Sequence, residues 1–206
     1  MRTALSRSIT HLALATLACP AVAAASEAET HDGFFAHASV GYGHTVMTST
    51  PLRIEGDGAL INLQAGASVS ENLSIFGHIS QTQIFAPTFR PNGAFQDDDQ
   101  DVSASIGAYG AGVTWYHLET NLYLSVVAAL VRASIEEQDR QDDSVDTRFR
   151  TDLGFGGLVT FGKEWWVDDE WGIGGAATAQ FSRIADQDQV TWHNGTFGVL
   201  FSATWN

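Results

Sequence analysis

The sequence is poor in cysteine, proline and basic residues. Its only cysteine, Cys19, lies within the first 25 residues, so the rest of the chain can form neither disulfides nor thiolate metal sites. No run of about 18 apolar residues follows residue 25, which excludes a transmembrane helix. Lys and Arg number 10 against 24 Asp and Glu, and a surface this acidic repels nucleic acid. With 44% hydrophobic residues, the chain is not disordered.

The first 25 residues have the pattern of a secretory signal peptide. Arg2 and Arg7 make the start positive, an Ala- and Leu-rich run covers residues 11–22, and small residues follow as cleavage sites at Ala23 or Ala25. We therefore expect a cleaved signal peptide at residues 1–25 and one domain over residues 26–206.

The end of the chain shows the pattern that organises the rest. From Phe197 to Trp205 every odd position is apolar, and the even positions are small or polar except Leu200. Period-two alternation is typical of a strand with one apolar face. Similar segments cover residues 34–44, 59–69, 73–82, 102–116, 122–130, 153–161 and 171–181. About eight strands of about 9–11 residues predict an all-β, transmembrane, antiparallel up-and-down β-barrel with its apolar face toward lipid.

The predicted connections alternate in length. Short turns near residues 70–72 and 117–120 contrast with long connections at residues 45–58, 83–100 and 131–152. Barrels have short periplasmic turns and longer external loops, so both termini are expected in the periplasm. The acidic runs Asp97–Asp101 and Glu136–Asp146 are either solvated loop charge or a place where Ca²⁺ bridges to lipopolysaccharide. They lack the spacing of an EF-hand, and neither a metal nor a cofactor is predicted.

Two sets of side chains are candidate sites. An aromatic girdle at the periplasmic headgroup level is predicted from residues near strand ends, the alternative being a soluble core: Trp115, Tyr116, Trp165, Trp166, Trp171 and Trp205. By alternation a second, polar set faces the lumen, either as a hydrogen-bonded filling or as a narrow water path or ligand pocket: His37, Ser39, Asn62, Gln64, Ser74, His78, Ser80 and Thr82, with Tyr123 and Gln180.

Several motifs resemble outer-membrane barrel proteins. The last strand, through Gly198, Phe201, Ala203 and Trp205, resembles their assembly signal, although Asn206 follows the aromatic residue. The barrel resembles the eight-stranded OmpA or OmpX type. Residues 110–116 (GAGVTWY), 162–167 (GKEWWV) and 202–206 (SATWN) resemble a group of small outer-membrane β-barrels of Gram-negative bacteria. The resemblance implies an outer-membrane location, insertion by the barrel-assembly machinery, contact with lipid and lipopolysaccharide, and a monomer. It carries over no activity.

His78 and Ser80 are the one hint of catalysis. They share a strand face, so the imidazole could activate the hydroxyl, and lipid A deacylases of the PagL type carry a His-x-Ser pair. Here Gln81 follows instead of Asn, and the pair comes early in the chain. We therefore expect a non-enzymatic barrel with a closed lumen, acidic external loops and a structural or surface-interaction role. The alternatives are a narrow pore or small-ligand barrel, a lipid A-modifying enzyme, and a soluble periplasmic barrel.

Overall fold

The chain folds as a closed barrel of antiparallel strands. The computed structural model describes residues 33–50, 52–91, 102–138, 145–185 and 190–205, and the expected signal peptide lies outside these ranges. Among the described residues we find no helix of the length and hydropathy that would cross a membrane.

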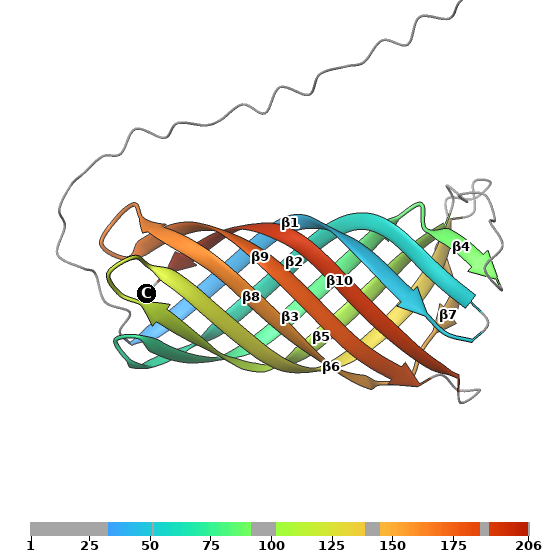
Figure 1. Ribbon diagram of the computed structural model, residues 1–206, viewed down its shortest axis with the longest axis horizontal. Coiled ribbons are helices and arrows are strands. Elements are labelled where there is room, and N and C mark those ends of the chain that lie inside the picture. The colour runs from blue at the N-terminus through green and yellow to red at the C-terminus, as the bar shows by residue number, and fades with distance from the viewer. Residues whose placement is uncertain (1–32, 51, 92–101, 139–144, 186–189, 206) are drawn as a thin grey trace, which may run out of the picture.

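Within the described ranges, eight long strands form the wall and two short strands extend it. Neighbours follow the order β1, β10, β9, β8, β6, β5, β3, β2, and the pairing of β2 with β1 closes the ring (Figure 1). The predicted all-β, antiparallel up-and-down barrel of eight strands is thereby confirmed. The long strands are β1 (Phe34–Thr48), β2 (Leu52–Ser70), β3 (Leu73–Phe85), β5 (Val102–His117), β6 (Leu122–Gln138), β8 (Gly154–Trp166), β9 (Trp171–Ala185) and β10 (Thr191–Trp205), and the short ones are β4 (Thr88–Pro91) and β7 (Val145–Arg150).

The two ends of the barrel differ. At one end, here named the turn end, β1 begins, β10 ends with Trp205 opposite Ala36, and residues 71–72, 118–121 and 167–170 connect strands. The other end, the loop end, carries β4 and β7 (Figure 1). The turn end thus has the short connections that outer-membrane barrels keep on their periplasmic side.

The strands are longer than the alternation predicts. They run for 13 to 19 residues, although about 9–11 suffice for a tilted strand to cross the hydrocarbon layer. The predicted long connection at residues 45–58 is wrong, because β1 continues to Thr48 and β2 starts at Leu52. The predicted loops at 83–100 and 131–152 are partly strand as well, in β4, β6 and β7. On β1, β2, β3, β6, β9 and β10 most of the extra length lies at the loop end and extends the barrel beyond the membrane, whereas β8 is extended at the turn end, to Trp166.

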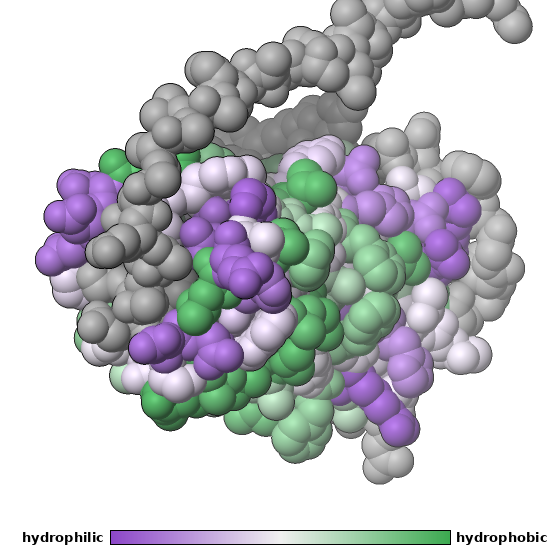
Figure 2. Space-filling model, turned by 60° about the vertical axis from the view of Figure 1, so that its left-hand side comes forward, coloured by the Kyte–Doolittle hydropathy of each residue, from purple (hydrophilic) through white to green (hydrophobic). Residues whose placement is uncertain are grey.

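The outer wall carries a continuous apolar belt. Val40 on β1, Ile79 on β3 and Val199 on β10 are each more than half exposed, and so are Phe161 and Phe201. In Figure 2 this belt appears as a green band that separates two more hydrophilic zones. A soluble barrel would bury such side chains, so a belt of this size marks a surface that faces lipid.

Beyond the belt, at the loop end, the polarity of the wall reverses. Along β5 the inner face carries Ala104, Ile106 and Ala108, all buried, whereas the outer face carries Ser103 and Ser105. Nearer the turn end the outer face becomes apolar. The change of phase near Gly110 and Gly112 suggests a bulge, but the register of β5 is unbroken there. The pattern inverts because the strand leaves lipid and enters water, where a dry interior is favourable.

Candidate functional site

The interior near the turn end holds a hydrogen-bonded chain of three side chains from three strands. The Thr204 hydroxyl on β10 donates to Glu164 Oε1 on β8 at 2.6 Å. Since that hydroxyl hydrogen is used, Thr204 Oγ1 accepts from His37 Nδ1 on β1, at 2.8 Å. His37 Nδ1 therefore carries a proton. This chain, here called the clasp, joins the first and last strands of the barrel to β8.

Glu164 is the central residue of the clasp, and it is only 2% exposed. His37 Nδ1 lies 3.5 Å from its Oε1, so imidazole and hydroxyl share the carboxylate. A carboxylate in so dry an environment is costly unless hydrogen bonds satisfy it. The alternation predicts this strand only over residues 153–161, which leaves Glu164 outside the predicted wall. Continuing the inner face from Leu158 and Thr160 by steps of two leads directly to it.

Two of the six predicted girdle residues face the wrong way. Tyr116 follows Trp115 directly on β5, so their side chains lie on opposite faces. Tyr116 is 3% exposed inside the barrel, 5.8 Å from the ring of Tyr123. Trp166 likewise lies half-buried on the inner side, beside outward Trp165. The remaining girdle positions lie on the outer wall at the turn end: Trp115, Trp165, Trp171 and Trp205.

The predicted lumen residues line the inner wall. Asn62 donates to Ser39 at 3.0 Å, and Ser74 bonds Ser68 at 2.9 Å. Thr82 is buried, as are the predicted partners Tyr123 and Gln180, while Gln64 is half-buried. Further threonine pairs, absent from the prediction, add to this network, namely Thr45 with Thr196 and Thr160 with Thr178.

His78 and Ser80 do not form an activated nucleophile. Both are buried, at 3% and 6% exposure, on the inner face of β3. Neither ring nitrogen of His78 has a hydrogen-bond partner among the described residues, so the imidazole does not contact the Ser80 hydroxyl. Nucleophile activation by a base requires that contact.

The interior of the loop end is filled by an apolar plug. It is built from buried side chains of the wall strands: Met47, Ile54, Ile84, Ala104, Ile106, Ala108, Val131, Ala133, Ile184 and Trp192. A second apolar group, with Phe35 and Phe76 in an edge-to-face contact at 6.0 Å, fills part of the interior nearer the turn end. The interior cavity lined by His37, Tyr116 and Tyr123 measures about 10 Å³. That volume admits about one water molecule.

Glycines on the inner wall make room for these large rings. A Cβ at Gly112 would lie 2.7 Å from the Phe76 ring, and one at Gly162 would lie 2.6 Å from the ring of Tyr123. Such distances are far inside van der Waals contact, so both rings need glycine opposite them. The lumen is thus packed like a protein core rather than left open.

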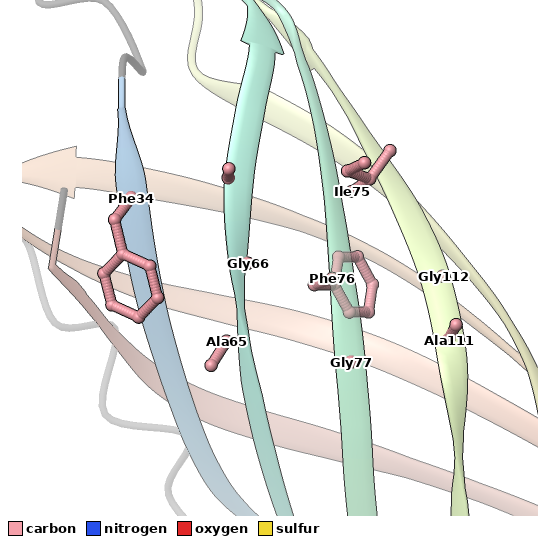
Figure 3. Close-up of a pocket in the computed structure, with 9 residues that line it drawn as sticks. Phe34, Ala65, Gly66, Ile75, Phe76, Gly77, Ala111 and Gly112 are labelled. Carbon is pink, nitrogen blue, oxygen red and sulfur yellow. The ribbon is translucent and has the colours of Figure 1, made fainter.

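Larger hollows lie outside the wall. One of about 570 Å³ covers β2, β3 and β5 near the turn end, where the outward positions are as small as Ala65, Gly77 and Ala111 (Figure 3). Phe34 and Ile75 border it. Its lining is apolar and it lies within the belt, so it is a recess in the lipid-facing surface.

The described residues contain no group of three or more His, Cys, Asp or Glu side chains that could hold a metal ion. The acidic run at residues 97–101 lies outside the described residues, and so do the side chains at 136–146.

A closed eight-stranded barrel with an apolar outer belt and a packed interior defines a small outer-membrane β-barrel protein. A solved structure shares this fold, and others match it less closely. Neisserial surface protein A (NspA) matches with a TM-score of 0.53 and 13% identity, over 86% of this chain and 99% of that one. Ail of Yersinia pestis gives 0.47 and 12% over 82% and 99%, and OprG of Pseudomonas aeruginosa 0.46 and 7% over 86% and 99%. No protein-family model and no curated protein matches the sequence.

Proposed function

We propose that this protein is a closed outer-membrane barrel that presents a rigid platform at the cell surface and conducts nothing through its lumen. The observation that carries this proposal is the apolar plug. Its members Ile54, Ile84, Val131 and Ile184 are fully buried inside the loop end, where a channel would need a polar, hydrated passage. The clasp and the ring of Tyr123 fill the other end.

The platform is the part of the barrel beyond the belt. There the wall has a dry interior and a polar outer face, as in a soluble barrel, and it supports β4 and β7. Loops on a rigid scaffold are where binding residues concentrate. We propose that surface partners bind at these strand ends and at the acidic connections between them. Lipopolysaccharide is the lipid partner, the barrel-assembly machinery inserts the chain, and the barrel works as a monomer.

Planar-bilayer recording tests the closed lumen. The purified full chain, added to a bilayer after heat-modifiable gel mobility has verified its folding, should give no discrete openings. Stepwise currents that recur across preparations would overturn the proposal and favour the narrow-pore alternative.

Epitope insertion tests the orientation. A short tag inserted at residues 49–51, between β1 and β2, should be detected by antibody on intact cells. The same tag at Asp168–Asp169, in the β8–β9 turn, is the matched control and should be detected only after the outer membrane is opened. The reverse result would place the platform in the periplasm.

A further inference from the structure

The basic side chains of the described residues gather at one end of the barrel. Arg53, Arg90, Arg132, Arg150 and Arg183 all lie toward the loop end, and Lys163 alone lies near the turn end. The net charge of the chain, which has 24 acidic residues, does not explain why its arginines gather at one end.

On one side of the barrel these charges are neutralised internally. Arg53 Nε donates to Glu55 Oε2 at 2.8 Å, and Arg90 also pairs with Glu55. His44 Nδ1 lies 2.7 Å from Asp57 Oδ1. This side, on β1, β2 and β4, therefore offers little net positive charge to a partner.

On the arc of the barrel from β6 through β8 and β9 to β10, the arginines stay uncompensated. Arg132 on β6, Arg183 on β9 and His193 on β10 are exposed, and their side chains form no ion pair or hydrogen bond with any residue that the structure describes. Arg183 and His193 are direct cross-strand partners. On its other side Arg183 pairs with Phe155 on β8. The second cross-strand partner of Phe155 is Leu130 on β6, which lies two residues before Arg132.

These residues surround an unusually exposed aromatic ring. Phe155 is 75% exposed on the outer wall, on the strand that separates the two arginines. Strands two apart lie about 10 Å from each other, so both guanidinium groups can reach one headgroup above that ring. Guanidinium binds phosphate with two parallel hydrogen bonds, which favours arginine for this role.

Arg132, Arg183 and His193, here called the cationic cluster, lie at a level along the barrel axis that suits a lipid headgroup. On β6, the apolar outward positions end at Leu130 and Arg132 follows; on β9 they end at Phe181 and Arg183 follows. The cluster therefore marks the boundary where acyl chains give way to headgroups. At the loop end this boundary belongs to the outer leaflet, whose lipid is lipopolysaccharide.

We infer that Arg132, Arg183 and His193 form a binding site for the phosphorylated headgroup of lipopolysaccharide, with its acyl chains lying over Phe155. The inference rests on the proposed orientation of the barrel and deepens the lipid contact stated there. It also explains how so acidic a protein holds a polyanionic lipid without a bridging cation.

Lipid titration tests this site. The full chain, folded in a neutral detergent with EDTA present, is titrated with bisphosphorylated lipid A and, separately, with dioleoyl phosphatidylglycerol, and bound lipid is counted by native mass spectrometry. The double variant Arg132→Gln/Arg183→Gln should bind lipid A about 100-fold more weakly, about tenfold for each guanidinium–phosphate pair removed. Arg53→Gln is the matched control, because that arginine is already paired, and it should bind within about twofold of the wild type.

Three results would overturn the inference. The first is equal binding of lipid A by the double variant and the wild type, each verified as folded by heat-modifiable mobility. The second is binding of phosphatidylglycerol as tight as that of lipid A. The third is lipid A binding that appears only when Ca²⁺ replaces EDTA, which would assign it to the acidic connections. Bilayer recording is independent of all three, so failure here leaves the closed-lumen proposal standing.

Discussion

Replacing Thr204 by valine should lower the stability of the barrel more than any other threonine change in its closing seam, the pairing of β1 with β10. Thr204 is fully buried and its hydroxyl joins His37 to Glu164, so valine keeps the shape but removes both bonds. A bond to a charged group contributes about 1.5–3 kcal/mol and a neutral one about 1 kcal/mol. We expect Thr204→Val to lower the free energy of unfolding by about 3 kcal/mol.

Thr45 provides the matched control. It lies on the same strand pair, β1 and β10, and is equally buried, and among the described residues its hydroxyl bonds only the Thr196 hydroxyl, at 3.0 Å. Thr45→Val removes one neutral bond and should cost about 1 kcal/mol. Reversible urea unfolding of the folded barrel in lipid vesicles, followed by tryptophan fluorescence and by gel mobility, measures both values.

The charge on Glu164 is what should separate the two variants. In a Glu164→Gln background both bonds of Thr204 are neutral, so Thr204→Val should cost about 2 kcal/mol and the double-mutant cycle should give a coupling of about 1 kcal/mol. If Thr45→Val is as damaging as Thr204→Val, or if the cycle shows no coupling, the clasp does not stabilise the seam and the reasoning is refuted.

Other substitutions test the packing and the two faces of the wall. Val199→Lys, in the lipid-facing belt, should lower the free energy of unfolding by about 2–4 kcal/mol, whereas Thr191→Lys, on the same strand beyond the belt, should change it little; equal losses would contradict the assigned membrane level. Ile84→Asp should destabilise the plug by more than about 3 kcal/mol, as judged by urea unfolding, whereas a mild effect would mean that the loop end is hydrated. Gly112→Ala should lower the thermal midpoint because its methyl would lie 2.5 Å from the Val126 carbonyl oxygen and 2.7 Å from the Phe76 ring, and Phe76→Leu should restore only the part of the loss that the ring causes; full rescue would show that the backbone contact costs nothing.

The alternation of the sequence was sufficient to determine the class of fold. Eight zigzag segments, each with one apolar face, can satisfy their backbone hydrogen bonds in lipid only by closing into a ring. The same alternation assigned Ser39, Asn62 and His78 to the inner face and Val199 and Phe201 to the outer face. These assignments follow from the two-residue period of a strand, which is local and needs no knowledge of the neighbours.

Where each strand leaves the membrane could not be predicted from the same pattern. Ala104, Ile106 and Ala108 form an apolar strand face in the sequence, but they belong to the plug and do not face the lipid. An apolar face indicates burial from water, and both lipid and a dry interior provide it. For the same reason Tyr116 could be mistaken for a girdle residue, although its neighbour Trp115 occupies the outward position.

The clasp and the cationic cluster depend on tertiary structure alone. His37 and Thr204 are 167 residues apart in the sequence, and Glu164 and Thr204 are 40 residues apart. They meet because barrel closure brings β1 beside β10, while Glu164 on β8 reaches both strands from inside the barrel. Arg132 and Arg183 likewise become neighbours of one ring only through the register of β6, β8 and β9. The sequence by itself determined that the chain is a membrane barrel; the stagger of its strands decided which polar groups meet inside it and which charges remain unpaired outside.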